Sequence, residues 1–357
     1  MAELEQLHER LDRTRWPDQP PGEGWELGTD LAYLRELCEH WRTSYDPSHL
    51  EERLNAFDNH RVDGTHFIWE RGEGEGCPVV LIHGWPGGPI EFLDVIPRLV
   101  EAGHDVVVPS LPGFAFSEIP DETLNVVAVA GRLRAVVEGG LGYERYAVQG
   151  GDWGAVISAR IAFEAPERVA ALHVNAVSVL PLPPNLDDPP LSEAEGAYLE
   201  RAQRWRLRRG YHLLVQSSAP QSLAYGLNDS PAGLAGWLVE KYREWSDCDG
   251  DVERRFSKDE LCDFLTMYWA TGTIASSMRL YLGERRERWR LAPGERVEVP
   301  AAVADFPKEI VRPPREWAER ILDLRRWTEM PRGGHFAAFE EPELLADDLV
   351  AFLGELE

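Results

Sequence analysis

The chain has 357 residues, of which 43% are hydrophobic, and it carries 13 tryptophans and a formal net charge of -25. The apolar content excludes a disordered chain, and the length suits one large domain with an inserted piece or two ordinary domains. Because the acidic residues are spread along the whole chain, they would repel phosphate backbones, and nucleic acid is not an expected partner.

The cysteines and the N-terminus indicate the compartment. The four cysteines lie at positions 38, 77, 248 and 262, without a C-x-x-C pair or a histidine at metal-ligand spacing, so neither a zinc site nor a disulfide framework is expected. The N-terminal stretch MAELEQLHERLDRTRWPD contains no apolar run of signal or membrane length. We expect a soluble cytoplasmic protein with no membrane anchor.

Residues 1–64 are predicted to form an N-terminal extension that packs on the core. Apolar residues at three- and four-residue intervals from Asp30 to about Phe57, broken at Pro47, predict two short amphipathic helices. A Pro- and Gly-rich arm precedes them. Because the extension alone is too small to bury much apolar surface, we expect it to pack against a main domain.

Short apolar runs bounded by turn residues then alternate with helical patterns, of which residues 125–140 are the clearest. This alternation predicts a mostly parallel sheet flanked by helices on both faces, an α/β architecture. The runs predicted as strands lie at residues 65–71, 78–84, 105–113, 145–151 and 171–177, and further runs lie at 297–306 and around 325–335.

A longer helical region rich in Trp, Tyr, Arg and Leu interrupts these strand-like runs. It extends over residues 180–293, and we predict that it forms a helical cap. The core would then consist of residues 65–179 and 294–357, closed by a final amphipathic helix at 341–356. The expected architecture is therefore one α/β domain with a cap insertion and an N-terminal extension.

The stretch VQGGDWGAVIS, residues 148–158, follows the pattern of a buried strand, a tight turn and a helix. In this context a G-x-nucleophile-x-G turn lifts one side chain above the carboxyl edge of the sheet. Gly150 and Gly154 would let the helix approach the strand closely, and the central position is Asp152. We predict that Asp152 is a nucleophile; the alternative is that it only caps the following helix.

Two further segments supply partners for such a nucleophile. In HGWPGG, which directly follows an apolar run, the backbone N–H of Trp85 would join that of Trp153 in an oxyanion hole. In PRGGHFAAF, His335 lies in a glycine-rich turn before the last helix and is predicted as the general base. The acid that orients this base is Glu309 or Asp305, and spacing alone does not choose between them.

A carboxylate nucleophile narrows the chemistry. It can open a strained ring or displace a halide at carbon, and either reaction leaves an alkyl ester that activated water hydrolyses. An epoxide needs a hydrogen-bond donor for its oxygen, and the cap offers Tyr211, Tyr268 and Tyr281. A halide site would use indole or amide N–H groups, which the tryptophans also supply, so the residues alone leave a haloalkane dehalogenase open.

Several segments together resemble the microsomal-type epoxide hydrolases and their soluble bacterial relatives. They are HGWPGG, PSLPGFAFS, QGGDWG, YGLNDSPAGLAGWL, FLTMYWATGTIASSMRLY, FPKEI and RGGHFAAFEEPELLADDL, and LDRTRWPD with HFIWE resembles that family's N-terminal domain. The resemblance covers nearly the whole chain. It implies the α/β-hydrolase fold and hydrolysis of a small-molecule epoxide to a vicinal diol, without a cofactor or a metal.

The resemblance also implies roles for single residues. It makes Asp152 the nucleophile, His335 the base and Glu309 the acid of the charge relay, and it makes Tyr211 and Tyr281 the residues that polarise the ring. Tyr268 becomes a packing residue. The many aromatic residues of the cap lead us to expect an apolar or aromatic substrate.

The biological role is less constrained by the sequence. Relatives of this type serve detoxification or the tailoring of bacterial natural products, including enediyne antibiotics. Lysine occurs only at positions 241, 258 and 308, and this Arg-rich, Lys-poor composition is typical of a GC-rich bacterial genome and fits either role. A catalytically silent α/β-hydrolase fold that binds a ligand is a further alternative.

Overall fold

A mixed sheet of eight strands lies at the centre of the computed structural model, which describes residues 2–187 and 189–356. The spatial order is β1-β2-β4-β3-β5-β6-β7-β8; β2 pairs antiparallel with β1 and β4, and the other neighbours are parallel. The predicted mostly parallel sheet is confirmed. The strands are β1 (Asn59–Val62), β2 (Thr65–Glu70), β3 (Gly76–Ile82), β4 (His104–Pro109), β5 (Tyr146–Gly150), β6 (Val169–Val174), β7 (Val297–Asp305) and β8 (Leu322–Glu329).

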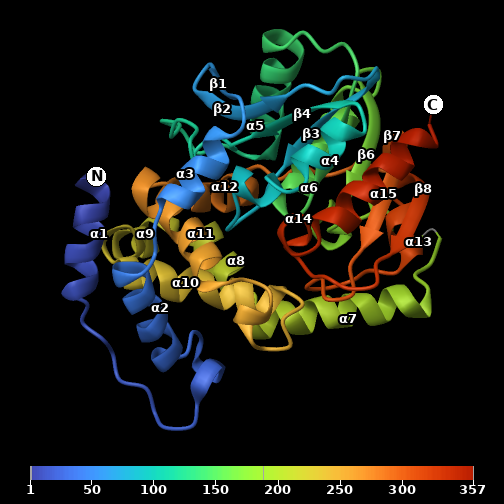
Figure 1. Cartoon of the computed structure of the whole chain (residues 1–357). Coiled ribbons are helices and arrows are strands. Elements are labelled where there is room, and N and C mark those ends of the chain that lie inside the picture. Colours follow the sequence, from blue (N-terminus) through green and yellow to red (C-terminus); the bar gives the residue numbers. More distant parts are fainter. Residues whose placement is uncertain (1, 188, 357) are drawn as a thin grey trace.

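Helices flank this sheet (Figure 1). The helix predicted over residues 125–140 is present, but its second half is a π-helical turn, Ala135–Gly140. Of the core helices, α4 packs against α15 and α5 packs against α6. The helices of the core are α4 (Ile96–Glu101), α5 (Val126–Arg134), α6 (Trp153–Glu164), α13 (Arg315–Glu319), α14 (Ala337–Glu340) and α15 (Pro342–Gly354).

The segment predicted as a helical cap follows β6 and precedes β7. A capping box at Ser192 and Glu195 starts its first helix, because each of the two residues satisfies an N–H of the other. The cap contains α7 (Glu193–Arg208), α8 (Tyr211–Ser218), α9 (Pro220–Asp229), α10 (Pro231–Trp245), α11 (Lys258–Thr271) and α12 (Ile274–Arg286).

The N-terminal extension contacts both the cap and the sheet. Its helices α1 (Ala2–Asp12) and α2 (Leu31–Thr43) lie against α10 and α11 of the cap rather than on the core (Figure 1). The buried indole N–H of Trp41 donates to Thr266 Oγ1 at 2.9 Å. After α3 (Ser48–Asn55) the chain enters the sheet as β1, so the sheet begins at Asn59 rather than at Thr65.

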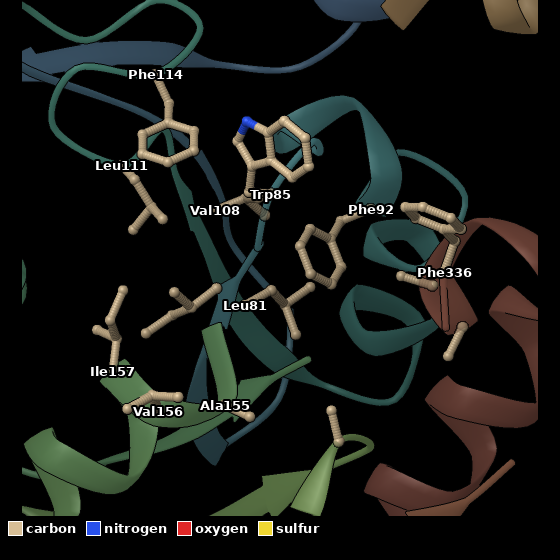
Figure 2. Packing of buried hydrophobic residues seen from close by; sticks show 14 of the residues in the cluster. Leu81, Trp85, Phe92, Val108, Leu111, Phe114, Ala155, Val156, Ile157 and Phe336 are labelled. Atoms are coloured by element: carbon tan, nitrogen blue, oxygen red, sulfur yellow. The ribbon is translucent and has the colours of Figure 1, made fainter. Parts of the chain in front are cut away.

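The parallel strands align their carboxyl ends. Ile82 of β3 pairs with Gly150 of β5, which in turn pairs with Val174 of β6, so the loops that follow these strands emerge at one edge of the sheet. Figure 2 shows Leu81 of β3 between the first turns of α6 and Phe92, beneath Trp85. This apolar packing holds the edge on which the site is built.

Within residues 2–187 and 189–356, no helix is both long and apolar enough to cross a lipid bilayer.

Candidate active site

Asp152 occupies a strained turn between β5 and α6. Its backbone φ of +49° lies in the left-handed region that non-glycine residues rarely adopt. The neighbouring glycines make the turn possible, because a Cβ on Gly154 would lie 1.8 Å from the carbonyl oxygen of Ile82. Although Asp152 stands at the N-cap of α6, its side chain makes no capping hydrogen bond. The carboxylate is therefore presented above the sheet edge.

The two oxygens of Asp152 have different surroundings. Oδ1 accepts the backbone N–H of Trp85 at 2.8 Å, and the backbone N–H of Trp153 also hydrogen-bonds the carboxylate. Trp85 precedes Pro86 through a cis peptide bond. The structure thus brings the backbone N–H groups of both predicted oxyanion donors to the carboxylate of Asp152.

His335 bridges Asp152 and Glu309. Its Nδ1 lies 2.8 and 3.0 Å from the two carboxylate oxygens of Glu309, and its Nε2 lies 3.5 Å from Asp152 Oδ2. The backbone N–H of His335 donates to the carbonyl of Trp245 at 2.9 Å. Asp305, the other acid candidate, instead binds the guanidinium of Arg312.

The charges of this triad support one another in a buried environment. Burial disfavours the imidazolium, but the carboxylates of Glu309 and Asp152 outweigh that effect and raise the pKa of His335 well above its usual value. Burial likewise opposes the carboxylate of Asp152, but His335 and the two tryptophan N–H groups hold the pKa of Asp152 below its usual value. The directions of both shifts favour an anionic Asp152 beside a cationic His335.

Tyr281 of α12 lies beside the two tryptophans whose backbones contact Asp152. Its ring centroid is 4.8 Å from that of Trp153 and 5.9 Å from that of Trp85, with the rings nearly perpendicular. Burial, reinforced by the charge of Asp152, raises the pKa of Tyr281 well above 10, so its hydroxyl stays protonated. The hydroxyl of Tyr268 donates to the carbonyl of Gly87 at 3.0 Å and thus packs the cap onto the HGWPGG loop.

Tyr211 is held elsewhere by a buried ion pair. Its hydroxyl donates to the carboxylate of Glu240 and accepts from Lys241 Nζ at 2.6 Å. The ammonium of Lys241 also lies 4.1 Å from the centroid of the Tyr211 ring. Among the contacts of the described residues, none joins Tyr211 to Asp152 or Tyr281. The structure therefore groups Tyr281, but not Tyr211, with the triad.

Two residues that were not singled out from the sequence also face this region. His212, the neighbour of Tyr211, stacks on Trp85. Glu91 lines a small cavity together with Asp152, His335 and Asn175, and burial raises the pKa of Glu91 to about 8. In the sequence, Glu91 is a single charged residue in the apolar run that follows HGWPGG, and this could have marked it as a site residue. No feature of the sequence distinguished His212 from its neighbour Tyr211.

Comparison with protein families matches two parts of the chain. The profile described as "Epoxide hydrolase N terminus" matches residues 1–92, and the profile described as "alpha/beta hydrolase fold" matches residues 78–222.

Individual relatives match nearly the whole chain. A protein of Stigmatella aurantiaca that is assigned as an epoxide hydrolase is 39% identical, over 97% of this chain and 81% of that protein. Epoxide hydrolase 1 of Sus scrofa is 33% identical, over 99% of this chain and 87% of that protein.

Solved structures agree with this similarity. The juvenile hormone epoxide hydrolase of the silkworm Bombyx mori superposes with a TM-score of 0.89 at 30% identity, over 99% of this chain and 92% of that one. The epoxide hydrolase of Aspergillus niger superposes with a TM-score of 0.85 at 26% identity, over 100% of this chain and 94% of that one.

Proposed function

Because the chain belongs to the microsomal-type epoxide hydrolase family, with the α/β-hydrolase fold, it is an epoxide hydrolase, and we propose that Asp152 opens the ring and His335 releases the product. The observation that carries this assignment is the unequal environment of the two Asp152 oxygens. Oδ1 is held by a backbone N–H of the oxyanion hole, whereas Oδ2 faces His335. Oδ2 is thus available to attack a ring carbon, and Oδ1 is placed to become the polarised carbonyl oxygen of the ester.

Ring opening begins with attack of Asp152 Oδ2 on a ring carbon. The ester C–O bond forms as the ring C–O bond breaks, and the negative charge moves onto the former ring oxygen. The hydroxyl of Tyr281, which lies over Trp153, donates a hydrogen bond to that oxygen and passes its proton to it. Tyr211, the second donor expected from the resemblance, hydrogen-bonds Glu240 and Lys241, and its part in this step is tested below.

Esterification changes the acid–base state of His335. Two carboxylates raise the pKa of this imidazole in the free enzyme, and the ester removes the charge of one of them. The pKa of His335 therefore falls, and the imidazolium returns a proton to the Tyr281 oxygen, directly or through water. Neutral His335, oriented by Glu309, is then a base.

Hydrolysis uses this base at the ester carbonyl. His335 takes a proton from a water molecule whose oxygen attacks Cγ of Asp152, and the resulting negative charge develops on Oδ1 beside the N–H groups of Trp85 and Trp153. The intermediate collapses as the proton of the added hydroxyl moves to the leaving alkoxide. The products are a vicinal diol, the carboxylate of Asp152 and the imidazolium of His335, so epoxide plus water is balanced.

The substrate that we propose is an apolar or aromatic epoxide. Beside the nucleophile, the ring centroids of Trp245 and Tyr281 lie 6.3 and 5.9 Å from that of Trp85. Such a wall favours flat or apolar substituents on the ring carbons.

We also propose a role in the tailoring of a bacterial natural product of the enediyne type, in the cytoplasm. The Arg-rich composition and the similarity to the Stigmatella protein support a bacterial source. An aryl epoxide that carries an alkynyl group should then have a higher kcat/KM than styrene oxide or alkyl oxides. Preference for small alkyl oxides would contradict this role.

An isotope experiment tests the covalent route. In a single turnover with excess enzyme in water enriched in ¹⁸O, the label is expected in the peptide that contains Asp152 and not in the diol. Peptide mass spectrometry measures this, with Asp152→Ala as the inactive control. Direct labelling of the diol with none in Asp152 would contradict the ester, and halide release from haloalkanes, assayed in parallel, is expected to be absent.

A further inference from the structure

We propose that His212 is the second hydrogen-bond donor to the epoxide oxygen, acting beside Tyr281. This inference rests on the proposed roles of Asp152 and Tyr281. It assigns to His212 the second hydrogen bond that Tyr211 was expected to donate. Tyr211 and His212 are consecutive residues at the start of α8, and either could in principle be this donor. Four observations favour His212.

The first observation is the position of the imidazole. His212 is 2% exposed, and its ring stacks on Trp85 with centroids 5.9 Å apart and an interplanar angle of 8°. It lies 6.3 Å from the ring of Tyr281 and 5.0 Å from that of Trp245. Through its backbone, Trp85 holds Asp152 and Trp245 holds His335. His212 thus shares its neighbours with the nucleophile, the base and the proton donor.

The second observation is an unused polar atom. Nδ1 of His212 is buried and has no hydrogen-bond partner among the described residues. A buried polar atom that stays unpaired is unfavourable, and such atoms are usually paired by protein, water or ligand. An epoxide oxygen bound between His212 and Tyr281 would pair with an imidazole N–H.

The third observation is the protonation state. Burial, assisted by the charge of Lys241, outweighs the opposing effects of Asp152 and of the Arg209 backbone and lowers the pKa of His212 to about 3, so the ring is neutral and carries one N–H. A neutral donor polarises the ring oxygen without forming an ion pair that would weaken Asp152 as a nucleophile. No bond to hydrogen breaks at His212 in this scheme, because Tyr281 supplies the proton.

The fourth observation concerns Tyr211 itself. Its hydroxyl is already bound on both sides, as donor to Glu240 and as acceptor from Lys241. Lys241 is fully buried, so releasing Tyr211 toward a substrate would disturb a buried ion pair. Tyr211 therefore anchors the start of α8 and leaves the adjacent imidazole to face the nucleophile.

The test compares His212→Phe with the matched variant Tyr211→Phe. Single-turnover ring opening is followed by stopped-flow tryptophan fluorescence, and breakdown of the ester is followed in the same trace. We expect His212→Phe to slow ring opening about 100-fold, the usual effect of removing one oxyanion donor, without changing ester hydrolysis. Tyr211→Phe should stay within about threefold of the parent.

Two amide variants separate hydrogen bonding from packing. His212→Asn places an N–H near the Nδ1 position and His212→Gln places one near Nε2, and one of them should recover at least about tenfold over His212→Phe. Ring opening within threefold of the parent in His212→Phe would overturn the inference, and so would equal losses in the Phe, Asn and Gln variants. A large loss confined to Tyr211→Phe would return the role to the tyrosine.

Failure of this inference can be told apart from failure of the proposed function. If Asp152 forms no labelled intermediate, the covalent route itself is wrong. If Asp152 is labelled while His212→Phe opens the ring normally, only the assignment of His212 is wrong.

Discussion

A single carboxyl group illustrates how the site is tuned at the scale of the residue. Glu91 is 8% exposed and faces Asp152 and His335 across their shared cavity. Gly87 leaves room for it, because a Cβ on that glycine would lie 1.7 Å from Glu91 Oε1. Burial raises the pKa of Glu91 from 4.5 to about 8. A neutral carboxyl, able to donate a hydrogen bond, therefore lies next to the ionic triad near neutral pH.

The shifted pKa of Glu91 makes stability depend on pH. Between about pH 4.5 and 8 the unfolded chain has lost this proton and the folded chain has kept it, so rising pH destabilises the protein. Glu91→Gln removes this effect. Its unfolding free energy relative to the parent should rise by up to about 1.4 kcal/mol for each pH unit in this window. Urea unfolding at several pH values measures the difference.

The matched control is Glu75→Gln, which removes one exposed glutamate. It should leave the unfolding free energy within about 0.5 kcal/mol of the parent at each pH. Parallel curves for Glu91→Gln and the parent would mean that Glu91 is ionised in the folded state.

At the scale of the element, the sequence patterns predicted most of the strands and the turn at Asp152. They did not predict which side chains of a helix face the site. Apolar runs predicted β2 to β7 because these strands are largely buried, whereas the polar, half-exposed β1 has no such run. The run predicted around 325–335 overlaps only the second half of β8, which is mostly half-buried. The turn at Asp152 was predictable from its glycines, because α6 approaches β3 so closely that Gly154 leaves no room for a Cβ. The choice of His212 over Tyr211 that we propose was not predictable, since successive helical residues point about 100° apart and only packing sets the register.

The last helix is joined to the sheet by one buried carboxylate. Asp348 of α15 accepts hydrogen bonds from His173 of β6 at 3.1 Å, and from Arg326 and Thr328 of β8 at 2.8 and 2.7 Å. Burial opposes this carboxylate, but these partners outweigh it and lower the pKa of Asp348 to about 2. The interaction thus holds α15 against two strands that flank β7.

Asp348→Asn should therefore destabilise the fold by about 3 kcal/mol at pH 7, because Arg326 loses the more buried of its two carboxylate partners. The contribution is present above the unfolded pKa near 4 and is lost as pH falls toward 2, so the two proteins should converge in acid. Chemical denaturation gives the values. The neighbouring exposed Asp347→Asn breaks only a surface pair with Arg98 and should cost less than about 1 kcal/mol; equal losses would contradict the assignment.

At the scale of the whole molecule, the N-terminal extension joins the cap to the sheet. Its first two helices lie on the cap and its last strand lies in the sheet. We expected packing on the core because an isolated extension needs a surface to cover, but the pattern of a helix does not say which surface that is. Buried Trp41 of α2, hydrogen-bonded to Thr266 of α11, shows that the apolar face of α2 is shared with the cap.

Trp41→Ala is expected to cost about 3 to 5 kcal/mol, the usual effect of deleting a buried aromatic ring. If the extension and the cap unfold together, far-UV circular dichroism should show one transition at a lower temperature, and KM for the epoxide should rise as the cap loosens. Trp41→Phe keeps most of the ring and loses one hydrogen bond, so it should cost far less. A separate early transition with unchanged KM would show that α2 does not support the cap.

Because the two oxygens of Asp152 have different surroundings, the oxygen isotope composition of the product should depend on the water used in the preceding turnover. In the mechanism that we propose, Oδ1 stays beside the N–H of Trp85, whereas Oδ2, which faces His335, attacks carbon, leaves with the diol and is replaced by an oxygen from water. Each diol then carries an oxygen atom that entered the protein one cycle earlier. If the carboxylate does not rotate, Oδ1 remains the same atom through any number of turnovers. The oxygen that Asp152 gives to each diol then comes from the water of the preceding turnover.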